Sequence, residues 1–191
     1  MKPFFSSKRH NMAHPQQRKF IQLIQGHFVK NNLNKLNRKI NILEIGSYDV
    51  NGSIREFLQT DSAQYIEVDL CDGKGVDVVS YGHKLSLPND SFDIAVSCEC
   101  FEHDEYWADT FKNMHRMTKP GGLIAFTCGT LGRLEHGIIR SNAEHSPGTQ
   151  FIGLDYYKNL DKEDFYNTFN IESMFSEHYF FLKIELRPLF F

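Results

Sequence analysis

One stretch of the chain, NILEIGSYDVNGS over residues 41–53, limits the fold more than any other. It begins with a short apolar run around one acid, Glu44, which is typical of a buried strand rather than of a helix. Gly46 follows at once and permits a sharp turn with a bare backbone. Ser53 then opens an amphipathic run, and a helix start there offers free N–H groups and the positive end of a dipole. Together these features predict a cradle for a nucleotide-type ligand.

An ordinary turn between a strand and a helix would look the same in sequence. The stretch lacks the G-x-G-x-x-G pattern of dinucleotide-binding folds, because Tyr48 stands where a second glycine is expected. The stretch alone therefore does not distinguish a ligand cradle from an ordinary turn. The segments that follow provide further evidence.

Length and composition favour a single domain. The chain has 191 residues, of which 41% are hydrophobic, enough for a full core. Its net charge of −3 disfavours a nucleic-acid binder, which is usually basic. No run of 18 apolar residues predicts a membrane-spanning helix, and the N-terminus has no apolar signal-peptide stretch. We therefore expect a cytoplasmic protein without membrane partners.

The four cysteines are expected to be free, buried thiols. Cys98 and Cys100 are two residues apart in an apolar run, so they share one face of a strand. A C-x-C pair can hold a metal, but no second Cys or His pair has the spacing of a zinc site. Cys71 and Cys128 stand alone.

The order of elements predicts an α/β fold with a doubly wound, mostly parallel sheet and helices on both faces. Strands are predicted at residues 41–45, 65–70, 76–79, 92–98, 123–128 and 178–186, with a short seventh strand at the end. Helices are predicted at residues 15–34, 53–58 and 104–118, the last capped by Asp104, and in two pieces over 155–175. Residues 1–14 are expected to form a flexible leader to a single domain, 15–191. The irregular segment 129–155 is expected to act as a lid or acceptor-binding loop.

Ligands of such a sheet bind beyond the carboxyl ends of the strands. The residues at these ends are glycines, acids and histidines, from Gly46 after the first strand to His136 after the fifth. Asp69 follows Gly46 by 23 residues and ends the second strand, where a carboxylate can accept both hydroxyl protons of a ribose. By itself Asp69 is equally well explained as the cap of a turn.

Five pieces in this order, ILEIG, YIEVDL, SFDIAVSCECFEH, MTKPGG and LIAFTC, resemble the class I S-adenosylmethionine-dependent methyltransferases, and most closely their methyltransferase type 11 group. The resemblance covers residues 40–130. It implies S-adenosylmethionine (SAM) as cofactor, S-adenosylhomocysteine (SAH) as product, and a seven-stranded sheet whose terminal antiparallel hairpin is short or truncated here.

The resemblance also implies a role for eleven residues. The methionine part of the cofactor would face Glu44 and the loop of Gly46, Ser47, Tyr48 and Asp49, the ribose would be held by Asp69, the adenine would be bordered by Leu70, Tyr81 and Gly82, and the floor near the sulfonium would be formed by Cys98 and Glu99. The chain departs from the family at Tyr48 and Val50, where glycines are usual, and at Tyr81, where an acid often contacts adenine.

Methyl transfer needs an aligned acceptor, exclusion of water and, for a protonated acceptor, a base. His103 is the first candidate for a catalytic base and His136, in GRLEHG, is the second. Each has a plainer explanation, since His103 can cap the next helix and GRLEHG can be only a turn. Tyr156, Tyr157 and Asn159 either close over this side or pack a helix start.

A metal site is not expected. His83, Glu102 and His103 are metal-ligand types, but they lie on different loops and supply one carboxylate.

These features predict a SAM-dependent methyltransferase that acts on a small molecule, with a sugar or polysaccharide precursor as the first guess. A non-catalytic domain that keeps the fold and binds the cofactor or a partner is the alternative. A nicotinamide-dependent oxidoreductase is disfavoured, because G-x-G-x-x-G and a Tyr-x-x-x-Lys pair are missing. The edge of a short terminal hairpin can pair with a second copy, so a homodimer remains among the expectations.

Overall fold

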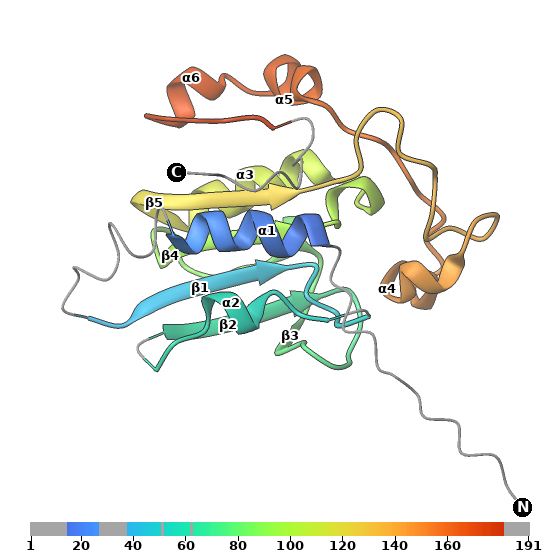
Figure 1. Ribbon diagram of the computed structural model, residues 1–191, viewed down its shortest axis with the longest axis horizontal. Coiled ribbons are helices and arrows are strands. Elements are labelled where there is room, and N and C mark those ends of the chain that lie inside the picture. The colour runs from blue at the N-terminus through green and yellow to red at the C-terminus, as the bar shows by residue number, and fades with distance from the viewer. Residues whose placement is uncertain (1–14, 27–37, 51, 62, 182–191) are drawn as a thin grey trace, which may run out of the picture.

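The computed structural model describes residues 15–26, 38–50, 52–61 and 63–181. Its centre is a parallel sheet with the strand order β3-β2-β1-β4-β5 (Figure 1). The strands are β1 Ile40–Ile45, β2 Ala63–Asp69, β3 Val78–Val79, β4 Phe92–Cys98 and β5 Thr118–Thr127. The predicted leader, residues 27–34 of the first predicted helix, and residues 182–191 at the end of the chain lie outside the described residues.

β1 is the central strand and pairs on both sides. Ile42 lies opposite Tyr65 of β2 on one side and opposite Ile94 of β4 on the other. The chain first runs outward from β1 through β2 to β3 and then returns to β4, so the strand order reverses beside β1. Because every pairing is parallel, the carboxyl ends of all five strands meet at one edge. This edge, at the reversal, is where ligands of such sheets bind.

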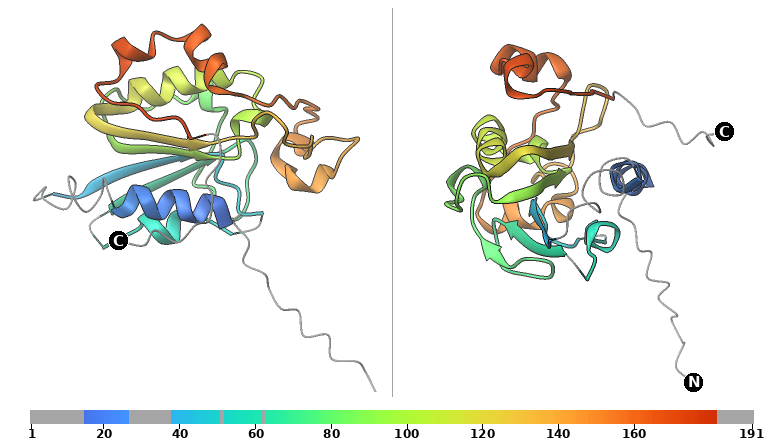
Figure 2. Two further views of the ribbon diagram at one scale, coloured as in Figure 1. Left: turned by 45° about the horizontal axis from the view of Figure 1, so that its top comes forward. Right: turned by 90° about the vertical axis from the view of Figure 1, so that its left-hand side faces the viewer.

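Helices cover both faces of the sheet (Figure 2). One face is covered by α1 Pro15–Ile24 and the single turn α2 Arg55–Leu58, and the other by α3 Trp107–Met117, α5 Lys162–Thr168 and α6 Ile171–Met174. Residues of β1 alternate between two hydrophobic cores, one on each face of the sheet. Ile42 packs with Ile21 and Leu58 in the first core, on the side of α1 and α2, whereas Leu43 packs in the second core, on the side of α3. Burial on both faces explains why β1 reads as a continuous apolar run.

An aromatic cluster joins the second core to the helices above it. Trp107 and Phe111 of α3 contact Phe165 of α5, with ring centroids 4.9 and 5.4 Å apart. Phe126 of β5 stacks on Phe165 at 4.8 Å. Full burial of such a side chain contributes about 1.5–3 kcal/mol, so the segment after β5 is fixed to the sheet by its phenylalanines.

The predicted architecture is confirmed, while several element bounds are wrong. β5 begins at Thr118, five residues before the predicted start, because Thr118 pairs with Phe92 and the chain then bulges before Leu123 pairs with Ile94. α3 begins at Trp107 rather than after a cap at Asp104, whose carboxylate instead accepts from the Tyr106 N–H and the Thr110 hydroxyl.

The C-terminal third also differs from the prediction. The segment 129–155, predicted to be irregular, contains a 3₁₀ turn at Ala143–His145 and the helix α4 Pro147–Phe151. Residues 178–181 have no strand, and the rest of the predicted sixth strand lies outside the described residues. Among the described helices, none has the length and apolar character needed to cross a membrane.

Asp93 of β4 is the best-compensated acid in the described part of the chain. Its side chain is 4% exposed and accepts from Arg38 (2.5 Å), Lys119 (2.9 Å) and the Asn41 N–H (2.9 Å). Burial alone would raise the pKa of this carboxyl, but the hydrogen bonds and the two cations outweigh burial and lower it to about 2. Asp93 thereby links the amino ends of β1, β4 and β5.

We expect Asp93 to make the free energy of unfolding decrease at acid pH. Its folded pKa lies below the unfolded value, so its contribution of about 2 kcal/mol is complete above pH of about 4 and is lost as pH falls through 2. Urea unfolding of the wild type and Asp93→Asn should differ by about this amount at pH 7 and converge near pH 2. Asp109→Asn, at an exposed ion pair with Lys112, is the control and should change little. A difference for Asp93→Asn that is the same at every pH would contradict the assignment.

Candidate functional site

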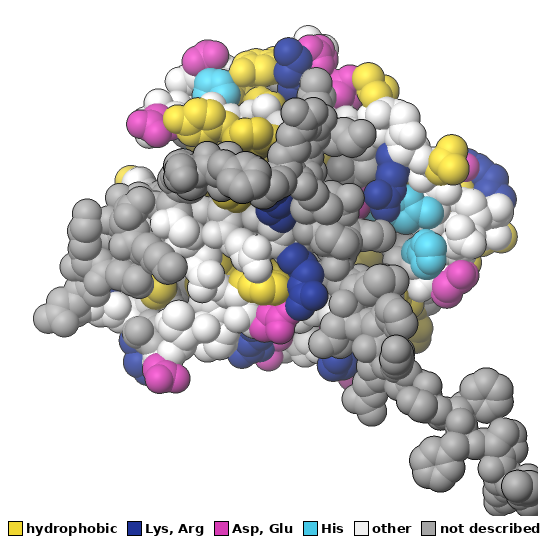
Figure 3. Space-filling view, viewed as in Figure 1, with side chains coloured by type: hydrophobic (Ala, Val, Ile, Leu, Met, Phe, Trp, Pro, Cys, Tyr) yellow, Lys and Arg dark blue, Asp and Glu magenta, His cyan; other side chains and the backbone are white. Residues whose placement is uncertain are grey.

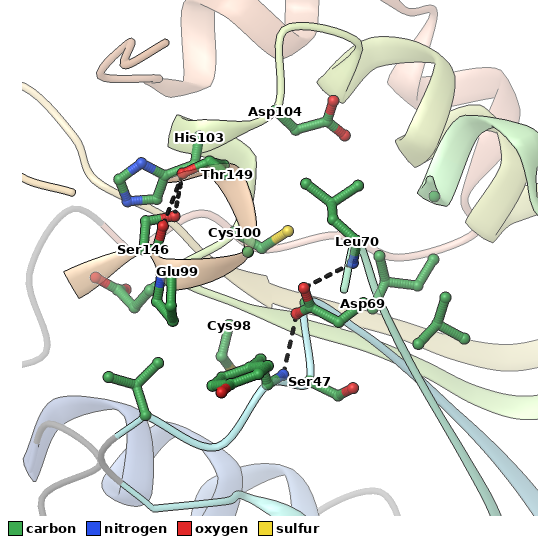
Figure 4. Close-up of a pocket in the computed structure, with 18 of the residues that line it drawn as sticks. Ser47, Asp69, Leu70, Cys98, Glu99, Cys100, His103, Asp104, Ser146 and Thr149 are labelled. Carbon is green, nitrogen blue, oxygen red and sulfur yellow. Dashed lines mark hydrogen bonds between the residues drawn. The ribbon is translucent and has the colours of Figure 1, made fainter. Parts of the chain in front are cut away.

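A cavity of about 460 Å³ opens at the carboxyl ends of the strands (Figure 4). The loops that follow β1, β2, β3 and β4 form its walls, and the segment around α4 forms the side opposite the sheet. Pockets of this size accommodate small molecules and cofactors. The cavity therefore lies where the parallel sheet predicts a binding site.

Ten of the eleven predicted cofactor residues line this cavity, namely Glu44, Gly46, Ser47, Tyr48, Asp69, Leu70, Tyr81, Gly82, Cys98 and Glu99. The exception is Asp49, which turns away from it. Its carboxylate pairs with Lys74 and accepts the Gly52 N–H at 2.6 Å, so Asp49 stabilises the loop itself. Both predicted catalytic residues, His103 and His136, also line the cavity.

The backbone N–H groups of the loop after β1 donate to acceptors of the protein itself. The N–H groups of Gly46 and Ser47 donate to the Val68 carbonyl, and the Tyr48 N–H donates to the Asp69 carboxylate at 3.0 Å. α2 has only four residues, so it provides no long dipole at this edge. These loop N–H groups are thus occupied by protein acceptors, and at the helix start, where free N–H groups were expected, the Arg55 N–H donates to the Ser53 hydroxyl. The buried Ser47 hydroxyl, by contrast, has no hydrogen-bond partner among the described residues.

Asp69 stands at the end of β2 in the middle of the cavity (Figure 4). Its two oxygens accept the N–H groups of Tyr48 and Leu70, at 3.0 and 2.7 Å. Burial raises the pKa of this carboxyl, and these hydrogen bonds act in the opposite direction. A carboxylate has about four acceptor positions, so Asp69 retains capacity for two further donors.

α4 lies directly against Asp69. A methyl group added at Gly148 would be 2.8 Å from the Asp69 Oδ1 atom. Ser146, Pro147 and Thr149 line the cavity beside it. The sequence predicted a lid or acceptor-binding loop over residues 129–155 but not this helix, although Pro147 directly after Ser146 is a helix-start signal.

Glu44 is buried on the β1 side of the cavity. Burial raises the pKa of its carboxyl to about 8, although a hydrogen bond from the Tyr65 hydroxyl (2.5 Å) opposes the shift. The nearby Arg55 is engaged by Glu67. Glu44 is therefore largely uncharged at neutral pH and supplies a polar but neutral wall.

The histidine side of the cavity contains a compact polar cluster. The rings of His103, His136 and Tyr157 lie mutually edge to face, with centroids 5.0 to 5.3 Å apart. Burial lowers the pKa of His103 to about 4, with a further lowering by His136, and burial also lowers the pKa of His136. Both imidazoles are thus neutral at physiological pH. Figure 3 shows histidine side chains gathered at this end of the molecule, next to basic ones.

Tyr157 packs on both of these histidines, but neither Tyr157 nor Asn159 is among the residues that line the cavity. The Tyr157 hydroxyl donates to Asn159, whose amide donates to the Arg133 carbonyl at 2.9 Å. His83, by contrast, stacks on Tyr106 with centroids 4.3 Å apart and lies apart from His103. Asp104, Glu105 and Tyr106 also line the cavity and were not among the predicted site residues.

The segment that carries most of this site, residues 43–126, matches the family model described as "Methyltransferase domain". This part of the chain is similar to the methyltransferase domains that the family model describes. A comparison with curated protein sequences gave no significant match.

Solved structures share the fold of this chain. The DszA carbon methyltransferase has a TM-score of 0.60 at 15% identity, over 83% of this chain and 46% of its own. The YcgJ protein of Bacillus subtilis (TM-score 0.53, 13% identity) is matched over 78% of this chain and 65% of its own. The CurJ carbon methyltransferase (0.53, 14%) is matched over 78% and 45%. The chain thus spans less than two thirds of the length of each.

The four cysteines of the chain are free, as predicted, but only Cys71 is fully buried, whereas Cys98, Cys100 and Cys128 are partly exposed. Burial raises the pKa of all four thiols, and neighbouring acids such as Glu44, Glu102 and Asp69 add to the shift. Because only the thiolate attacks disulfide reagents, we expect slow reaction with DTNB at pH 8 in the native state and four thiols released after denaturation. Rapid labelling of the folded protein would contradict this placement of the cysteines.

Proposed function

We propose that this chain binds SAM in the cavity and transfers its methyl group to a small-molecule acceptor. The observation that carries the proposal is that the segment matching the family model also supplies most walls of a ligand-sized cavity at the reversal of strand order.

The residues present suit this cofactor. The unpartnered Ser47 hydroxyl is a buried polar group that a ligand would satisfy. Asp69 has acceptor capacity for two hydroxyl groups of a ribose. Glu44 is held neutral and so adds little negative charge beside the carboxylate of a bound amino acid.

The cofactor, when bound, supplies an electrophilic methyl group on a sulfonium, which needs no further activation. The chain has to place the acceptor and keep water away. In the proposal Cys98 and Glu99 form the floor, Leu70, Tyr81 and Gly82 border the adenine, and α4 covers the ribose side. His103 and His136 face the acceptor as neutral imidazoles, in the protonation state that a general base requires.

A hydroxyl of a sugar or polysaccharide precursor is the acceptor class we would test first. This choice rests on the family resemblance in the sequence. The net charge of −3 supports a small acceptor over a nucleic acid.

The cofactor part of the proposal is tested by calorimetric titration with SAH. We expect micromolar binding by the wild type and about tenfold or greater weakening in Asp69→Ala, because charged hydrogen bonds to the ribose are lost. Asp69→Asn keeps one acceptor oxygen and should bind with intermediate affinity.

Asp72→Ala, an exposed acid three residues further on, is the matched control and should bind as the wild type does. NADH serves as the control ligand. Absence of SAH binding at millimolar concentration, or weakening by Asp72→Ala alone, would refute this cofactor site.

A non-catalytic binding domain is the second candidate. It is favoured by the loop after β1, whose N–H groups are already used, and by the close approach of Gly148 to Asp69. The double variant His103→Ala/His136→Ala separates the two candidates. We expect it to keep SAH affinity within about twofold while losing transfer of labelled methyl from SAM to a panel of sugars. Wild-type protein that binds SAH but labels no acceptor would favour the binding domain.

A further inference from the structure

A fully buried carboxylate without partners lies beside the two cavity histidines. Glu102 has 0% of its surface exposed, and neither carboxylate oxygen has a hydrogen-bond partner among the described residues. Such a group is costly to bury unless something compensates it.

The residues next to Glu102 suggest what could compensate its carboxylate. One potential ligand atom each from Glu102, His103 and His136 lie within 4.8 Å of one another. The three residues come from the turn after β4 and from the segment after β5, so only the folded chain brings them together. We propose that Glu102, His103 and His136 bind a first-row divalent transition metal ion such as Zn²⁺.

The free atoms of the two imidazoles suit this role. His103 Nδ1 is buried and has no partner in the described part of the chain. His136 Nδ1 lies 3.1 Å from the Leu134 carbonyl oxygen. In the tautomer in which Nδ1 donates to that carbonyl, Nε2 carries the lone pair, which is the usual arrangement of a metal-binding histidine.

Two imidazoles and one carboxylate form a donor set suited to Zn²⁺ and its neighbours rather than to Mg²⁺ or Ca²⁺. Ligand atoms on a tetrahedral Zn²⁺ are about 3.3 Å apart, so no separation within the group has to shorten by more than about 1.5 Å. The segment that carries His136 can provide this movement, because Leu131 and Leu134 on it are 73% and 85% exposed.

The surrounding charges tolerate a cation. The nearest basic side chain, Arg133, lies 3.8 Å from the carboxylate of Glu99, which offsets its charge. Glu99 has a left-handed backbone, with φ of +51°, at the end of β4. An uncommon conformation at a cavity wall is typical of functional sites.

A metal here would leave its fourth position open to the cavity. His103 and His136 line the cavity, whereas Glu102 lies behind them. Three protein ligands with one open position are the pattern of catalytic rather than structural metal sites. An oxygen or nitrogen of the small-molecule acceptor would fill that position, and His103 and His136 would then act as metal ligands in place of the general bases proposed above. The site does not depend on the proposed cofactor, since it can be loaded without SAM.

The test is equilibrium dialysis of the full chain, free of any affinity tag, against Zn²⁺, with metal content measured by mass spectrometry. We expect one ion per chain with micromolar or tighter affinity, and the visible ligand-field bands of a low-symmetry site when Co²⁺ replaces Zn²⁺. Glu102→Gln and His136→Ala should each weaken binding at least about tenfold. Retained SAH binding by these variants would show that they are folded and that the two sites are separate.

Two control variants test whether the bound ion lies at Glu102, His103 and His136 rather than at other histidines. His145→Ala removes an exposed histidine whose ring centroid is 6.1 Å from that of His136, and it should leave Zn²⁺ affinity unchanged. His10→Ala/His14→Ala removes histidines near the N-terminus and should do the same. Absence of saturable Zn²⁺ binding would overturn the proposal. Binding that survives Glu102→Gln and His136→Ala, or that either control abolishes, would overturn it as well, because the ion would then lie elsewhere.

Discussion

The structure depends on the parallel pairing of β1 with a strand on each side. This pairing satisfies the backbone groups of Ile40–Ile45 within the sheet and leaves both faces to be covered by helices. It also points the carboxyl ends of all five strands to one edge. The loops at that edge are released from strand pairing, so they can differ in length and carry polar side chains. The cavity is a consequence of this geometry.

Charge is distributed unequally between the two ends of the sheet. At the amino end of β4, Asp93 is matched by Arg38 and Lys119, and its pKa is low. At the carboxyl end, burial raises the pKa of Glu44 and Glu102, and neither carboxyl has an ion pair among the described residues. Acids without a compensating cation are expensive to bury, and they occur where ligands bind. The amino end thus serves stability, while the carboxyl end carries buried acids without an ion pair among the described residues.

The sequence alone was sufficient for the parts of the fold that rest on local patterns. Short apolar or alternating runs bounded by glycine and polar turns predicted the strands β1 to β4, and the bounds of β1 and β4 were closest because these two strands are buried on both faces. It also predicted Asp69 and the loop at Gly46 as cavity residues, since the ends of parallel strands necessarily meet. The bounds of β5 were missed, because its bulge depends on pairing with a strand far away in sequence.

The sequence by itself determined the fold class, the edge at which ligands bind and the types of residue gathered there. Only the tertiary structure decided which of these residues meet. It turned Asp49 to Lys74, placed α4 against Asp69, and brought His136 rather than His83 to Glu102 and His103. The physical reason is that periodicity fixes an element and its buried face, whereas the path of a loop is set by packing and hydrogen bonds between segments far apart in the chain.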